Sequence, residues 1–107
     1  MTDSISPAEL SRLLDEKENV KVFDVRLKED YVEVTHPVPT AEWRNPHEVA
    51  EWSQQIGDIG EVIVYCVHGH HVSQSTRDVL RQQGIKARIL EGGIEAWQAF
   101  VKDRPLP

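Results

Sequence analysis

The sequence contains a single cysteine, Cys66, among its 107 residues. No intrachain disulfide is therefore available, and a lone cysteine is typical of a reducing compartment, which predicts a cytoplasmic location. No apolar run approaches the roughly 20 residues that a membrane-spanning helix needs. The first four residues have neither the basic flank nor the apolar stretch of a secretory signal, so we expect neither membrane insertion nor export.

Basic residues are scarce relative to acidic ones. The chain has 12 Lys and Arg against 18 Asp and Glu, for a formal net charge of −6. This balance argues against nucleic acid or an anionic membrane surface as a partner. With 39% apolar and 28% charged residues, the composition is typical of a globular protein, and the length predicts one domain over residues 1–107.

Strand and helix patterns alternate along the chain. Three β-branched runs, residues 20–25, 62–65 and 87–90, predict strands, and the second is apolar at every position, as a strand covered on both faces is. Apolar residues at helical spacing predict four helices. These begin after or near Ser6, Asn45, Ser73 and Gly92–Gly93. Residues 31–45, interrupted by prolines, show no regular pattern. The alternation predicts an α/β fold, with helices on both faces of a parallel sheet.

Cys66 follows the apolar strand 62–65 and precedes a short loop rich in histidine. The loop residues are Val67, His68, Gly69, His70, His71 and Val72. Ligands of open parallel sheets bind at the carboxyl ends of strands, and loop amides with a helix N-terminus attract anions. We therefore predict an anion-binding loop around a nucleophilic Cys66 thiolate. A buried structural cysteine is the alternative.

Four segments resemble the rhodanese-like sulfurtransferase domain, and the likeness covers nearly the whole chain. They are Ile5–Leu10, Asp24-Val25-Arg26 with Tyr31, the Tyr65-Cys66 loop, and Leu90-Glu91-Gly92-Gly93 followed by Trp97. The resemblance implies a five-stranded parallel sheet flanked by helices. It also implies that Cys66 accepts a sulfane sulfur from thiosulfate or a persulfide donor and passes it to a thiol or cyanide.

The resemblance has further implications for the site and its partners. No metal and no organic cofactor is needed for such a transfer. A protein partner, if one exists, would be thioredoxin or another sulfur-carrier protein. Asp24 and Arg26 follow a strand and are expected to form an ion pair that supports the loops near the site.

The Cys66 loop departs from the usual family pattern in two ways. Many members have an arginine five residues after the cysteine, where this chain has His71, and the loop is one residue longer if Ser73 is the serine that closes it. Dual-specificity phosphatases of the same fold have such a longer loop, which takes phosphate or arsenate, but they end it with an arginine where Val72 stands here. A phosphatase or arsenate-type enzyme is therefore the alternative within this fold.

The histidines open an alternative of another class, a non-catalytic sulfur- or metal-binding domain. Cys66, His68, His70 and His71 are all suitable metal ligands. Four ligands on one short loop rarely reach tetrahedral geometry, however, and the spaced pairs of known zinc sites are absent. We therefore predict no metal site.

Overall fold

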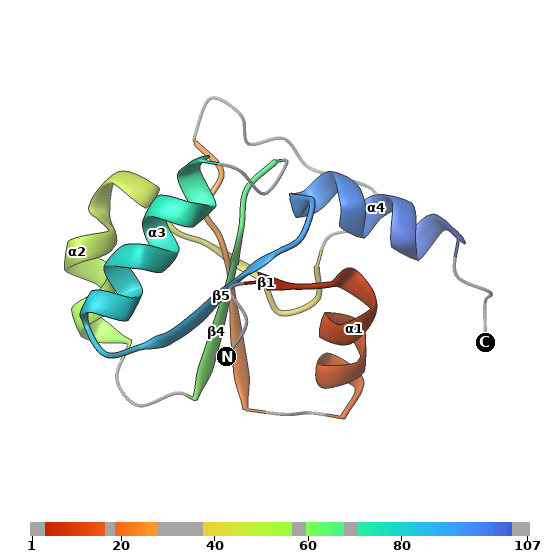
Figure 1. The fold of residues 1–107 in the computed structure, drawn as a ribbon, viewed down its shortest axis with the longest axis horizontal. Helices are drawn as coiled ribbons and strands as arrows, with labels where there is room; N and C mark the ends of the chain where they lie inside the picture. The colour runs from red at the N-terminus through yellow and green to blue at the C-terminus, as the bar shows by residue number, and fades with distance from the viewer. Residues whose placement is uncertain (1–3, 17–18, 28–37, 57–59, 68–70, 104–107) are drawn as a thin grey trace.

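The computed structural model describes residues 4–16, 19–27, 38–56, 60–67 and 71–103, with His71 and Asp103 as backbone only. Within these residues, five parallel strands form one sheet in the order β1-β5-β4-β2-β3 (Figure 1). The strands are β1 (Ser4–Ile5), β2 (Val20–Asp24), β3 (Glu42–Trp43), β4 (Glu61–Tyr65) and β5 (Lys86–Leu90). The helices are α1 (Pro7–Asp15), α2 (Val49–Trp52), α3 (His71–Gln82) and α4 (Gly93–Asp103). The predicted five-stranded parallel α/β fold is confirmed.

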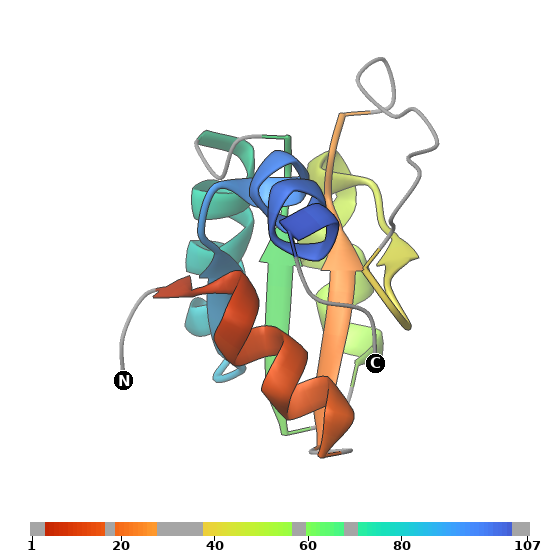
Figure 2. The same cartoon turned by 90° about the vertical axis from the view of Figure 1, so that its right-hand side faces the viewer.

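Helices cover both faces of the sheet, as predicted. Figure 2 shows α1 and α4 in front of the sheet and α2 and α3 behind it. Each face has its own apolar cluster. The α1/α4 face buries Ile5, Leu10, Val22, Val38, Ile63, Tyr65, Leu90, Ile94 and Trp97. The α2/α3 face buries Phe23, Val25, Val49, Trp52, Val62, Val64, Leu80, Ala87 and Ile89.

Strand β4 is the central strand, between β5 and β2. Its residues Val62–Tyr65 are at most 2% exposed, so the uninterrupted apolar pattern reflects burial on both faces. Alternate residues serve opposite clusters, with Ile63 on the α1/α4 face and Val64 on the α2/α3 face. Because β4 is the middle strand, Cys66, the residue after it, lies at the middle of the row formed by the carboxyl ends of the strands.

The capping signals act as the sequence predicts at two helix starts. The Ser6 side chain accepts a hydrogen bond from the Glu9 amide (3.1 Å) at the start of α1, and the Asn45 side chain accepts one from the His47 amide (3.0 Å). The third helix, expected to begin near Ser73, is α3, which begins at His71. Ser73 is fully buried inside its first turn, where its hydroxyl faces Cys66.

The resemblance implied five strands, but the residues that form the two outer strands were not predicted. β1 and β3 have two residues each, too few to show a strand period. β3 lies in the segment expected to be irregular and exists because Phe23 and Asp24 of β2 pair with Glu42 and Trp43. Tyr31, and residues 31–37 as a whole, lie outside the described part of the chain.

Described segments that come after β2 and β4 in the chain pack on opposite faces of the sheet. Val38 and Ala41, after β2, contact the α1/α4 cluster, whereas α3, after β4, packs on the other face. In open α/β sheets, ligands bind at the carboxyl ends of neighbouring strands whose connections lie on opposite faces. Arg26 lies two residues after the end of β2, and Cys66 directly follows the end of β4.

In the described residues, no helix has the length and apolar character to cross a bilayer.

Candidate active site

Cys66 is held between the end of β4 and the first turn of α3. Its side chain is buried, and the Sγ atom lies 3.3 Å from the Ser73 hydroxyl, to which the thiol donates a hydrogen bond. A serine hydroxyl is both donor and acceptor, so it is also able to donate to a thiolate at the same position. The arrangement therefore suits either protonation state of Cys66.

Only part of the predicted anion-binding loop is described. Val67 and Val72 are half-buried at the two ends of the loop. His68, Gly69, His70 and the side chain of His71 lie outside the described residues, so the prediction for the loop stays untested. The described residues contain no cluster of three side chains able to hold a metal ion. The histidine-based metal alternative concerns residues outside that set.

The first turn of α4 donates hydrogen bonds to the backbone of Cys66 and Val67. The Ile94 amide donates to the Cys66 carbonyl (2.9 Å), and the Glu95 amide donates to the Val67 carbonyl (3.3 Å). The loop carbonyls thus satisfy helix amides that have no partner within α4. Gly93 permits this approach, because a Cβ atom there would lie 2.4 Å from the Cys66 carbonyl oxygen. The sequence predicted a helix after Gly92–Gly93 but gave no sign of this contact.

We expect Gly93→Ala to lower the free energy of unfolding by about 3 kcal/mol, because it combines left-handed strain with a backbone clash. Gly93 has a φ of 64°, and Gly84 has a φ of 81° but nothing within 4 Å of a built Cβ. Gly84→Ala is thus the matched control, with strain alone and an expected cost of about 1 to 2 kcal/mol. Urea unfolding measures both. Equal losses of unfolding free energy in the two variants would show that a Cβ atom at position 93 does not clash with the Cys66 backbone.

Asp24 and Arg26 form the expected ion pair. Both side chains are buried, and Arg26 Nη2 donates to Asp24 Oδ2 at 2.7 Å. The Arg26 Nε atom also donates to both carboxylate oxygens, and the Arg26 amide donates to Oδ1 at 3.0 Å. These hydrogen bonds, together with the opposite charge of the carboxylate, offset the free-energy cost of removing the guanidinium from water.

The ion pair supports the strand ends on either side of it. Between its two members, the Val25 amide donates to the Tyr65 carbonyl (2.9 Å), directly before Cys66. The Trp43 indole donates to the Arg26 carbonyl (2.9 Å) and so ties β3 to the same turn. The Trp43 contact was not predicted, since the residues of β3 were not.

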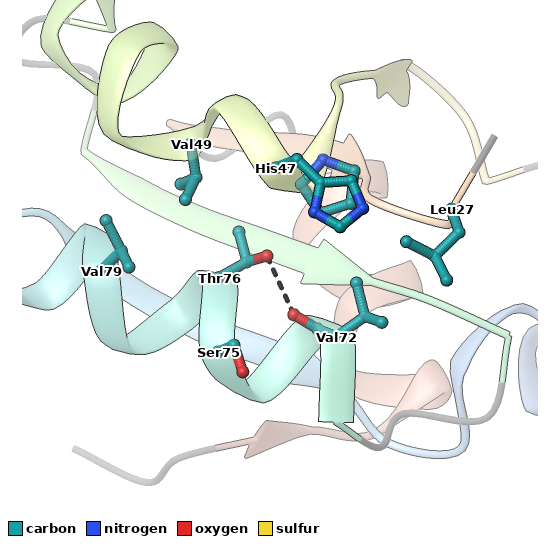
Figure 3. A pocket seen from close by; sticks show the side chains of 8 residues that line it. Leu27, His47, Val49, Val72, Ser75, Thr76 and Val79 are labelled. Atoms are coloured by element: carbon teal, nitrogen blue, oxygen red, sulfur yellow. Dashed lines mark hydrogen bonds between the residues drawn. The ribbon is translucent and has the colours of Figure 1, made fainter.

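A cavity of about 320 Å³ opens between α2 and α3 (Figure 3). Its lining residues are Leu27, Pro46, His47, Val49, Val72, Ser75, Thr76 and Val79. His47 is exposed, and its position on this cavity was not foreseen from the sequence.

Comparison with known proteins assigns the fold. A family model described as the rhodanese-like domain matches residues 6–100, whereas no curated protein sequence matches the chain. A rhodanese-like domain protein from Staphylococcus aureus is 26% identical, with a TM-score of 0.75 over 90% of this chain and 91% of that one.

Two more distant structures share the fold alone. A thiosulfate sulfurtransferase from Pseudomonas aeruginosa is 20% identical, with a TM-score of 0.77 over 94% of this chain and 19% of that one. A Rhodopseudomonas palustris protein described as a possible tyrosine phosphatase is 16% identical, with a TM-score of 0.74 over 98% of this chain and 84% of that one. Since the family model spans most of the sequence, the chain belongs to the rhodanese-like domain family.

Proposed function

We propose that this protein is a sulfurtransferase that carries a sulfane sulfur as a persulfide on Cys66. The observation that carries the proposal is the position of Cys66, at the carboxyl end of the central strand with Sγ 3.3 Å from the Ser73 hydroxyl. Cysteines that act as nucleophiles occupy such polar positions beside helix N-termini. The chain has no other cysteine to carry the sulfur.

The reaction is a displacement at sulfur. The Cys66 thiolate attacks the outer sulfur of thiosulfate, a bond forms between the two sulfurs, and sulfite leaves with the electron pair of the broken sulfur–sulfur bond. An acceptor thiolate or cyanide then attacks the outer sulfur of the persulfide, and Cys66 leaves as a thiolate. Thiosulfate, sulfite and the persulfide are all anions, so the site must stabilise negative charge throughout.

We assign this stabilisation to the backbone amides of the loop after Cys66. Its members are Val67, His68, Gly69, His70, His71 and Val72. Asp24 and Arg26 act as positioning residues, because their ion pair fixes the turn beside Tyr65. The donor and acceptor are small molecules in this proposal, and a sulfur-carrier protein such as thioredoxin is a further acceptor to test.

Incubation with thiosulfate tests the proposal directly. We expect the intact mass of the wild-type protein to rise by one sulfur atom and to return to its original value after cyanide or a small thiol is added. A protein whose mass does not change at thiosulfate concentrations that load other sulfurtransferases would contradict the proposal.

The phosphatase alternative predicts a different result. Phosphoryl transfer needs a dianion held at the end of the loop, for which a planar guanidinium is suited. Val72 has no charge, is half-buried and lines the cavity between α2 and α3. We therefore expect no hydrolysis of an aryl phosphate above the rate of a Cys66→Ser control. Hydrolysis that depends on Cys66, together with no sulfur uptake, would favour the alternative.

A further inference from the structure

The cavity between α2 and α3 lies beside the Cys66 loop. Its volume of about 320 Å³ is within the range of small-molecule sites. In Figure 3, Leu27 and Val72 lie at one end, next to the arrowhead of β4, and Val79 lies at the other. Cys66 directly follows β4, and Ser73, the neighbour of Val72, contacts its Sγ atom. One end of the cavity therefore adjoins the proposed sulfur site.

The lining of this cavity is mainly apolar. Among the eight described residues that line it, there is no carboxylate, lysine or arginine, and His47 is the one titratable side chain. The Thr76 hydroxyl already donates to the Val72 carbonyl (2.9 Å), which leaves its methyl group among the aliphatic side chains. Moving a doubly charged anion from water into such a lining is unfavourable, whereas an alkyl chain gains free energy there. The described part of the lining therefore suits an alkyl group better than thiosulfate.

We propose that this cavity binds the apolar substituent of the sulfur acceptor, an organic thiol with a short alkyl or aryl group. This inference rests on the proposed sulfurtransferase function and adds the class of acceptor. The acceptor thiolate attacks the outer sulfur of the Cys66 persulfide, and a new sulfur–sulfur bond forms. The bond to Cys66 Sγ breaks, Cys66 leaves as a thiolate, and the product is the persulfide of the acceptor. The total charge is unchanged, and no external oxidant or reductant is needed.

A series of linear thiols measures the contribution of the cavity. With thiosulfate as donor, we expect kcat/KM to rise from ethanethiol to propanethiol to butanethiol, about two- to fourfold per methylene. Cyanide, which has no apolar substituent, serves as the reference acceptor. The rise reflects burial of methylenes at the end of the cavity next to Cys66.

Two tryptophan variants provide the matched pair. Ser75 is an exposed residue of α3 that lines the cavity, and Gln74 is its exposed neighbour that does not. We expect Ser75→Trp to fill the cavity and to remove the dependence on chain length, with turnover on cyanide within twofold of wild type. Gln74→Trp should retain the dependence.

The outcomes separate this inference from the proposed function. A wild-type protein that forms the persulfide but shows equal kcat/KM for all three thiols would overturn the acceptor assignment alone. A Ser75→Trp variant that loses activity on cyanide and butanethiol equally, or retains the full chain-length dependence, would overturn it as well. Absence of any sulfur adduct on wild-type Cys66 would overturn the sulfurtransferase function and, with it, this inference.

Discussion

Cys66→Ser is expected to abolish sulfur uptake from thiosulfate and to reduce turnover to the uncatalysed background. Serine provides a hydroxyl that does not form a persulfide, and the chain has no second cysteine to replace it. The effect is therefore the largest that one substitution is expected to have on this protein. Intact mass after thiosulfate treatment and steady-state turnover with cyanide measure it.

The loss should arise from chemistry rather than unfolding. A serine at position 66 retains a donor toward the Ser73 hydroxyl, now 3.3 Å from Sγ, so we expect a change in the free energy of unfolding of at most about 2 kcal/mol. Circular dichroism and urea unfolding provide this control. Sulfur uptake by the serine variant would place the sulfur on another group and contradict the assignment of Cys66.

Asp24→Ala is expected to lower the free energy of unfolding by about 3 to 5 kcal/mol, because it removes the Asp24 carboxylate from beside the buried Arg26 guanidinium. The side chains of the pair are only 4% and 5% exposed. A domain of this size has a total stability of roughly 5 to 15 kcal/mol, so the loss is a large fraction of it. Turnover should fall too, since the turn that the pair holds is bonded to Tyr65, next to Cys66.

Glu16→Ala is the matched control for that loss. Glu16 also pairs with an arginine, Arg12, at 3.1 Å, but both side chains are about half exposed. Removing an exposed pair on one helix costs about 0.3 to 0.5 kcal/mol. Chemical unfolding of the two variants in the same buffer compares them. A loss for Asp24→Ala as small as that for Glu16→Ala would show that the buried pair adds little to stability.

The sequence by itself predicted the elements whose signals are local. The apolar run of β4 predicted a strand buried on both faces, and Ser6 predicted the start of α1. Alternation of strands and helices predicted the parallel sheet, which in turn placed Cys66 at its carboxyl edge. The ion pair of Asp24 and Arg26, which the structure shows, was expected from the resemblance to the rhodanese-like family rather than from a local pattern.

Tertiary structure alone decided the contacts between distant segments. Gly93 lies against the Cys66 carbonyl across the β5–α4 turn, and His47 and Val72 share one cavity although they belong to separate helical segments. The two-residue strand β3 exists through its pairing with β2. Such contacts depend on how helices and strands pack against one another. The local sequence pattern shows which face of an element is buried, but it does not show which distant residues that face meets.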